Sequence, residues 1–230
     1  RYSHLYVNGQ YTGLYHVRER FDSSFLAEYL GGDEDDYEAV NGGRAVDGDG
    51  SAWAAVVAAS SNYDAFRELV DIDNYLEYMI LSFYAGNDWD WNPDQNWMAA
   101  GPVLGGTGAG RFVFHASDSD ICLYYDWDIN ILHEVGPAYT FYYLKTESSP
   151  DFWMRFADRA HALLAEDGVL SSDRNIERYQ YVTGSIEDAV VAESARWGQG
   201  WWDREAHWRV ERQRLLADYF PLRTDELLRQ

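Results

Sequence analysis

The chain has 230 residues, of which 47% are hydrophobic, and its formal net charge is −21. This length and composition suffice for one large domain, or for two small lobes that share a core. The negative charge argues against non-specific binding to nucleic acid or to an anionic membrane, and a bound nucleotide would need a metal ion to mask the repulsion. No apolar stretch is long enough for a membrane span, and a single cysteine, Cys122, excludes a disulfide framework.

The first thirty residues predict a β-hairpin followed by a short helix. The chain enters a strand pattern directly at Arg1, so we expect a segment cut from a longer protein. Two aromatic, β-prone runs flank Asn8-Gly9, a pair typical of a type I′ turn. Residues 23–30 then predict a helix with Ser23 or Ser24 as its N-cap.

A strong helix is predicted over residues 71–85, and two strands are predicted after it. Asp71 or Asp73 can cap the helix, and Gly86 can end it. Its apolar face contains Leu76, Met79, Ile80 and Phe83. The strands, residues 96–101 and 110–117, are joined by a glycine-rich hairpin that lacks the Lys-Ser/Thr ending of a phosphate loop.

From residue 149 onward the pattern is helical. Ser149 can cap a helix that has Pro150 at its first position. Later residues predict further helices, including a long one that Pro221 stops and a short terminal one that Thr224 caps. A β-rich front and a helical back predict an α+β fold.

Acidic and amide side chains cluster where the strong helix ends and again where the second strand ends. The two clusters comprise Asp88, Asp90, Asn92, Asp94 and Asn96, and then Asp118 and Asp120. A hairpin joins them, so we expect them to converge on one cleft. Converging carboxylates repel each other unless a cation binds them or one keeps a proton. Without a supporting His or Cys, the oxygen ligands favour Mg²⁺ or Mn²⁺, and an aspartate outside the metal shell can act as a general base.

A simpler interpretation stays open, in which these aspartates only cap helices and shape turns. The six histidines show no metal-binding spacing, and His115 is interpreted as a packed strand residue rather than a ligand. The tryptophans beside paired acids leave a third alternative, a glycoside hydrolase with two opposed carboxyl groups.

Six segments, in order, resemble the CotH kinase family, which is named for a spore-coat protein. They are "YVNGQYTGLYHVRERFD", "AVDGDGSAW", "VDIDNYLEYMILSFYAGNDWDWNPDQNW", "FVFHASDSDICL", "FADRAH" and "ESARWG". The resemblance runs through nearly the whole chain. It implies an atypical protein kinase that transfers the γ-phosphate of ATP to Ser or Thr hydroxyls of a protein substrate with Mg²⁺ or Mn²⁺. It also implies an extracellular, cell-surface or spore-coat location.

The resemblance further implies a kinase-like, two-lobed single domain over residues 1–230. Residues 1–50 would be the truncated nucleotide-side lobe, and residues 51–230 the catalytic-loop and helical lobe.

The family pattern also assigns roles to individual residues. Asp90 takes the position of the catalytic base, with Asp88 as its competitor, and Glu19 takes the position of a glutamate on the nucleotide side. The metal positions fall on Asn96, Asp118 and Asp120.

Two positions depart from the family pattern. Ser117 stands where the family has tryptophan, and Asn41 stands where it often has lysine. These departures favour an alternative function, a catalytically inactive, kinase-like binding module of a secreted or cell-surface protein.

Overall fold

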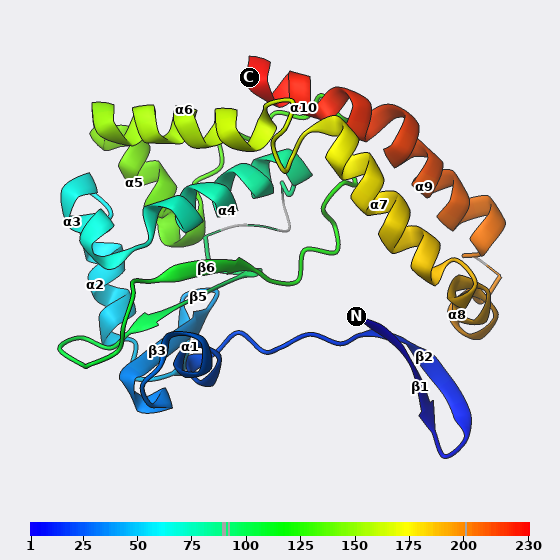
Figure 1. Ribbon diagram of the computed structural model, residues 1–230, viewed down its shortest axis with the longest axis horizontal. Helices are drawn as coiled ribbons and strands as arrows, with labels where there is room; N and C mark the ends of the chain where they lie inside the picture. Colours follow the sequence, from blue (N-terminus) through cyan, green and yellow to red (C-terminus); the bar gives the residue numbers. More distant parts are fainter. Residues whose placement is uncertain (89–90, 92, 201) are drawn as a thin grey trace.

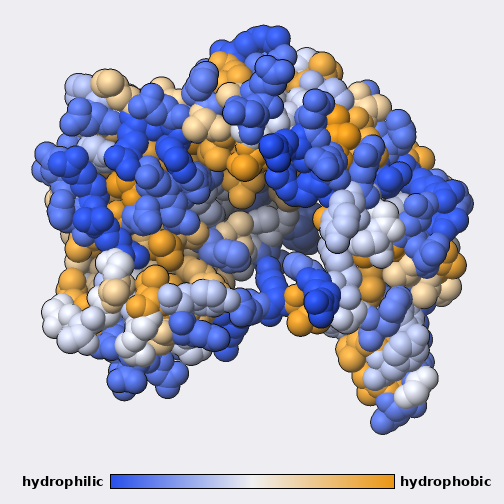
Figure 2. All heavy atoms as spheres, in the orientation of Figure 1, coloured by the Kyte–Doolittle hydropathy of each residue, from blue (hydrophilic) through white to orange (hydrophobic). Residues whose placement is uncertain are grey.

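The computed structural model describes residues 1–88, 91, 93–200 and 202–230. The fold is α+β, as predicted, with two antiparallel sheets and a mainly helical second half (Figure 1). The main sheet lies beneath α4, α5 and α6, while α7, α8 and α9 form the other side of the molecule (Figure 1). Figure 2 shows that this face of the molecule is hollowed between these two parts.

The N-terminal hairpin is confirmed. Strand β1 (Tyr2–Val7) pairs antiparallel with β2 (Gln10–His16), and the turn residues Asn8 and Gly9 have φ values of 51° and 80°. Positive φ at both positions is the geometry of a type I′ turn. The hairpin lies away from the main sheet and beside α8 (Ala189–Trp197) (Figure 1).

The main sheet has the strand order β4-β3-β5-β6, counted over the described residues. Its strands are β3 (Tyr37–Asn41), β4 (Arg44–Asp47), β5 (Trp97–Pro102) and β6 (Val113–Ala116). The predicted glycine-rich hairpin joins β5 to β6, and the register places Trp97 opposite Ala116. The segments that precede β5 and follow β6 therefore leave the sheet at the same end.

Each face of the main sheet carries its own apolar cluster. On one face, α1 (Ser23–Leu30) covers Tyr37, Ala39 and Ala100. On the other, Val40 and Ala99 join the large core beneath α2 (Ser51–Ala59) and α4 (Ile72–Ala85). This division follows from the alternation of side chains along a strand.

The N-cap of α1 differs from the prediction. Asp22 caps the helix, because its carboxylate accepts a hydrogen bond from the Phe25 amide at 3.1 Å. Ser23 and Ser24 are already inside the first turn, so the prediction was late by one or two residues.

Helix α4 follows α3 (Tyr63–Leu69) and forms as predicted. Asp71 is the N-cap, accepting a hydrogen bond from the Asn74 amide at 3.2 Å, and Gly86 ends the helix with φ 62°. The predicted apolar face is buried, and the residues that form it are Leu76, Met79, Ile80 and Phe83. A buried helix with a defined end is a rigid support for the acidic loop that follows.

The remaining helices are α5 (Thr140–Glu147), α6 (Pro150–Leu164), α7 (Ser172–Ile186), α8, α9 (Arg209–Arg214) and α10 (Phe220–Arg229). Short turns of 3₁₀ type lie at Glu34–Asp36 and Pro137–Tyr139. Among the described residues, no helix combines the length and the apolar character needed to cross a membrane.

The predicted stop at Pro221 is wrong. A π-type turn at Arg204–Trp208 leads into α9, and a second one at Leu215–Tyr219 joins α9 to α10. Pro221 lies in the first turn of α10. A proline is tolerated there because the wide turn before it interrupts the regular hydrogen-bond ladder. Thr224 is not an N-cap, since it is buried inside α10 and donates a hydrogen bond to the Leu170 carbonyl at 2.8 Å.

Candidate metal centre and adjoining cleft

The acidic loop begins at the end of α4 and is fastened there by an indole. The Asn87 amide donates to the Ser82 carbonyl at 3.3 Å and the Asp88 amide to the Gly86 carbonyl at 3.0 Å. Trp91 is buried and donates from Nε1 to the Tyr78 hydroxyl at 2.6 Å. Because Tyr78 belongs to α4, Trp91 ties the loop back onto the helix that precedes it.

The far end of the loop is tied both to β5 and to residues 131–139. The Pro93 carbonyl accepts hydrogen bonds from Trp97 Nε1 at 3.2 Å and from the Ala138 amide at 2.8 Å. Trp91 and Trp97 thus serve packing and anchoring, and the shared Pro93 carbonyl brings two segments together that lie about forty residues apart in sequence.

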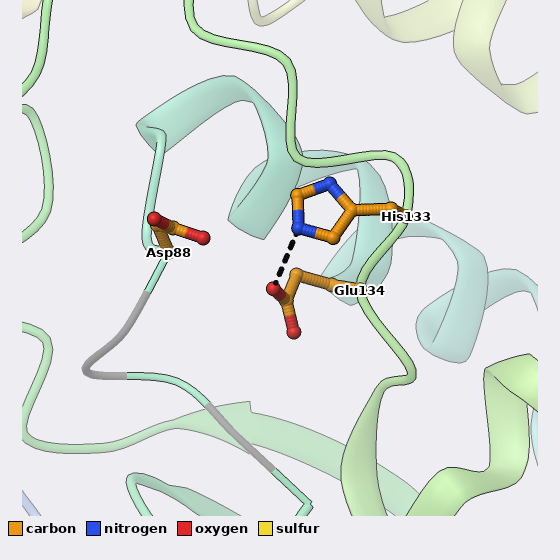
Figure 3. Close-up of side chains that lie close together, drawn as sticks. All are labelled: Asp88, His133 and Glu134. Carbon is orange, nitrogen blue, oxygen red and sulfur yellow. Dashed lines mark ion pairs between the residues drawn. The ribbon is translucent and has the colours of Figure 1, made fainter.

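Asp88, His133 and Glu134 form the candidate metal centre. Each offers one ligand atom, and these atoms lie within 4.8 Å of one another. Figure 3 shows the three side chains pointing toward one another, from the loop after α4 and from the segment before α5. His133 Nε2 lies 3.3 Å from Glu134 Oε1. No other such group of three His, Cys, Asp or Glu side chains occurs in the part of the chain that the structure describes.

The electrostatics of the centre favour a cation. Burial raises the pKa of Glu134, and the charge and hydrogen bond of Asp88 raise it further, while His133 opposes the rise. Burial and a neighbouring carboxylate both disfavour the ionised form of Glu134. A divalent ion bound between the side chains would offset this unfavourable interaction.

Lys145 holds the segment that carries His133 and Glu134. Its Nζ donates to the Leu132 carbonyl at 3.0 Å and to the Glu134 carbonyl at 3.3 Å. Burial lowers the pKa of this ammonium, which also lies 5.0 Å from the centre of the Phe141 ring. The lysine therefore fixes the backbone of the segment that carries His133 and Glu134.

The donor set fits one of the two predicted ions better than the other. Two carboxylates and one imidazole suit Mn²⁺, which accepts nitrogen ligands, whereas Mg²⁺ prefers oxygen ligands alone. Asn87, which precedes Asp88, is also buried, and its Oδ1 lacks a hydrogen-bond partner.

The predicted metal positions Asn96, Asp118 and Asp120 lie around one end of the main sheet. Asn96 precedes β5 and has φ 61°, while Asp118 follows β6 and has φ 50°. Both aspartates are exposed, and neither enters a described group of three metal-ligating His, Cys, Asp or Glu side chains. The Leu123 amide donates to the Ala85 carbonyl at 2.7 Å, so the loop that carries these aspartates returns to the end of α4.

The predicted catalytic base Asp90 and its neighbour Asn92 lie outside the described residues. The competing candidate, Asp88, is the one that joins His133 and Glu134.

Glu19 lies in a small cleft beside the end of β6. The cleft has a volume of about 200 Å³, and its lining residues are Arg18, Glu19, Arg20, Phe21, Met98, His115 and Ser117. The Glu19 carboxylate accepts a hydrogen bond from the Tyr29 hydroxyl at 2.9 Å. His115 is an exposed residue of β6 and stacks on Phe21 with ring centres 5.2 Å apart. Arg18 and Arg20 share this cleft with the Glu19 carboxylate, and Arg20 also pairs with Asp22 at 3.4 Å.

No family model, no curated protein and no solved structure matches this chain.

Sequence reasoning missed His133 and Glu134. They lie between Tyr124 and Pro137, where no helix or strand forms, and their position depends on hydrogen bonds from Lys145 and to Pro93. The only local signal is a histidine beside an acid, which is too common to point to a metal.

Proposed function

We propose that this protein is an atypical protein kinase that uses Mn²⁺ or Mg²⁺ to transfer the γ-phosphate of ATP to Ser or Thr hydroxyls, within a kinase-like two-lobed fold. The observation that carries the proposal is the meeting of Asp88, His133 and Glu134 at the end of α4, beside the loop that bears Asp118 and Asp120. The motif resemblance supports the same reaction class.

In this proposal, Asp88, His133 and Glu134 hold the divalent ion, and Asp118 and Asp120 extend the acidic surface toward β6. A bound divalent ion would screen the negative charge of the phosphates, which the acidic chain would otherwise repel. Trp91 and Tyr78 keep the loop against α4, so that Asp88 holds its position. Asp90 keeps the role of general base that the resemblance implies, accepting the proton of the acceptor hydroxyl.

Arg18 and Arg20 are proposed to contact the nucleotide phosphates. They flank Glu19 in the cleft that also contains Ser117, the residue immediately before Asp118. One guanidinium group can donate two parallel hydrogen bonds to the oxygens of a phosphate, so arginines suit this task. The cleft volume of about 200 Å³ suffices for a phosphate group but is smaller than a typical site for a whole ligand, so the base and sugar would extend beyond it.

The test is transfer of labelled γ-phosphate from ATP to a generic acceptor protein with Mn²⁺ present. We expect the full chain to label the acceptor, and we expect Glu134→Gln and Asp118→Asn to reduce labelling by at least about tenfold. Asp158→Asn is the matched control, because Asp158 is an exposed aspartate on α6. Equal labelling by all four proteins would contradict the proposed site.

A second candidate function, a metal-dependent binding module without catalysis, is favoured by Asn41. This residue lies exposed at the end of β3, where the resembling family often has a lysine. The module predicts Mn²⁺ binding by the wild-type chain without any labelling of the acceptor. Labelling that Glu134→Gln abolishes would exclude this alternative.

A further inference from the structure

A second pocket lies far from the metal centre, between α8 and the start of the C-terminal helix. Its volume is about 480 Å³, within the range of small-molecule sites. The residues that line it are Val190, Glu193, Ser194, Trp197, Gly198, Trp202, Asp203, His207, Trp208 and Glu211. We call it the tryptophan pocket. Neither the proposed kinase reaction nor the metal centre uses any of these residues.

Aromatic rings make up much of its wall, and two of them are open to solvent. Trp202 is 70% exposed and Trp197 is 52% exposed. Trp202 and His207 lie with ring centres 5.0 Å apart. Indoles that contribute nothing to a core but line a concave surface are typical of ligand recognition.

Hydrogen bonds hold the indole of Trp197 and the backbone at Trp202. Trp197 Nε1 donates to the Thr12 carbonyl of the hairpin at 2.9 Å, and the Trp202 amide donates to the Gly198 carbonyl at 3.0 Å. The pocket is therefore a fixed surface into which a ligand can fit without first ordering the backbone.

The charged groups of the pocket leave an excess of negative charge. Glu211 is paired with Arg214, whereas Glu193 accepts hydrogen bonds from two neutral donors, the Tyr11 hydroxyl and the Leu14 amide. Asp203 faces His207, with Oδ2 lying 3.7 Å from Nδ1. Two carboxylates thus lack a permanently charged partner within the pocket.

Two arginines near the pocket each lie over the ring of one tryptophan. Arg196 lies 4.8 Å from the Trp197 ring centre, and Arg212 lies 5.9 Å from that of Trp208. Trp202 has no such cation among the described residues. Trp202 and Asp203 both line the pocket, which therefore contains an exposed indole and a carboxylate.

We propose that the tryptophan pocket binds an organic cation, a quaternary or alkylated ammonium group. Such a cation gains from the negative face of an indole and from a nearby carboxylate, and it loses little on leaving water because its charge is spread over methyl groups. A neutral sugar would stack on the same indoles, but it would gain nothing from the negative charge of Glu193 and Asp203. The net charge of −21 also favours a positive ligand.

The test uses choline as the probe and the full chain as the protein, with indole N–H signals in a two-dimensional ¹H–¹⁵N spectrum as the readout. We expect saturable shifts in the signals of Trp197 and Trp202, assigned by substitution. The neutral isostere 3,3-dimethyl-1-butanol, in which carbon replaces the charged nitrogen, is the matched ligand control and should shift them far less.

Two variants probe the two parts of the site. Trp202→Leu removes an exposed ring, and Asp203→Asn removes a charge while keeping an oxygen that can accept the Ala206 amide hydrogen bond of the helix N-cap. Each should weaken choline binding by roughly 3- to 30-fold, the range expected for loss of one cation–π or ionic contact. Trp153→Leu, a partly exposed tryptophan on α6, is the control that should leave binding unchanged.

Each result of these binding measurements either supports or overturns the proposal. Binding that requires the positive charge, Trp202 and Asp203 supports the proposal. No saturable shift with choline, equal binding of the neutral alcohol, or binding only of a neutral oligosaccharide would overturn it.

Discussion

Glu38 shows how a single residue can carry a structural role that its neighbours in sequence do not reveal. It lies on β3 with no exposed surface, and its carboxylate accepts hydrogen bonds from the Trp53 amide at 2.6 Å and the Ala52 amide at 3.4 Å. These amides belong to the first turn of α2, whose N-cap Gly50 has no side chain to offer. The negative charge of Glu38 thus caps a helix from a neighbouring strand.

We therefore predict that Glu38→Ala lowers the free energy of unfolding by about 2–4 kcal/mol, because it leaves buried amides unpaired. Glu38→Gln keeps an acceptor oxygen and should cost less than half as much. Urea unfolding followed by circular dichroism measures both variants. An alanine variant as stable as the wild type would show that water replaces the carboxylate at no cost.

His115 predicts a pH dependence of stability. Burial lowers its pKa below the ordinary value of 6.5, and the nearby Arg18 adds to the effect. Below pH 6.5 the unfolded chain takes up a proton that the folded protein resists, so stability falls as the pH drops toward the folded pKa and is unaffected above 6.5.

The matched variant is His115→Phe, which keeps the stack on Phe21. We expect this variant to lose part of the decline in urea midpoint that the wild type shows between pH 7.5 and pH 5.5. An identical decline in both proteins would assign the pH dependence to other groups.

At the scale of elements, Arg223 joins the C-terminal helix to the end of α4. Its guanidinium is fully buried and donates to the Tyr84 carbonyl at 2.9 Å, to the Phe83 carbonyl, and to the carbonyls of Trp127 and Ile129 at 2.9 and 2.6 Å. The Tyr219 hydroxyl donates to the same Tyr84 carbonyl at 2.6 Å. Carbonyls that a helix end leaves unpaired are thus satisfied by another helix.

Arg223→Lys should destabilise the protein by about 2–5 kcal/mol, because an ammonium cannot reproduce the planar fork and leaves buried carbonyls unpaired. Thermal unfolding measures the loss. Arg229→Lys on the same helix is the control, since Arg229 is exposed and pairs with the nearby Glu226. Equal melting temperatures for the two variants would contradict this role.

The sequence predicted correctly those helices and hairpins whose ends are determined by residues at the ends themselves. Asp71, Gly86 and Asn8-Gly9 all act within a few residues of their own position, and the predicted helix and hairpin form there. The prediction at Pro221 was wrong because the π turn before it depends on tertiary packing.

The candidate site was likewise predicted only in part. The acidic loop after α4 was placed correctly at the end of the helix, but His133 and Glu134 were missed, since hydrogen bonds from distant residues position them. Distant contacts of this kind leave no periodic pattern in the sequence.

At the scale of the whole molecule, the hairpin is held by a few contacts with α8. The Tyr11 hydroxyl donates to Glu193 at 2.6 Å, and Trp197 donates to the Thr12 carbonyl at 2.9 Å. Burial and the hydrogen bond to Glu193 raise the pKa of Tyr11 to about 12. The exposed segment Val17–Arg20 connects this unit to α1 and forms no helix or strand.

Tyr11→Phe should therefore loosen the hairpin without weakening the core. We predict faster amide hydrogen exchange in β1 and β2, by about 3- to 10-fold for loss of one hydrogen bond to a charged group, and no change in α4. Tyr29→Phe, which removes a hydroxyl bonded to Glu19, is the control. Unchanged rates of amide hydrogen exchange in β1 and β2 would mean that other contacts hold the hairpin.

The central claim, that Asp88, His133 and Glu134 form a divalent metal site, is tested most directly by Mn²⁺ binding measured with electron paramagnetic resonance. We predict one bound Mn²⁺ per chain at the centre, with affinity at least about tenfold lower in Asp88→Asn and in Glu134→Gln and unchanged in Asp158→Asn. Equal Mn²⁺ affinity in the wild type and all three variants would contradict the claim.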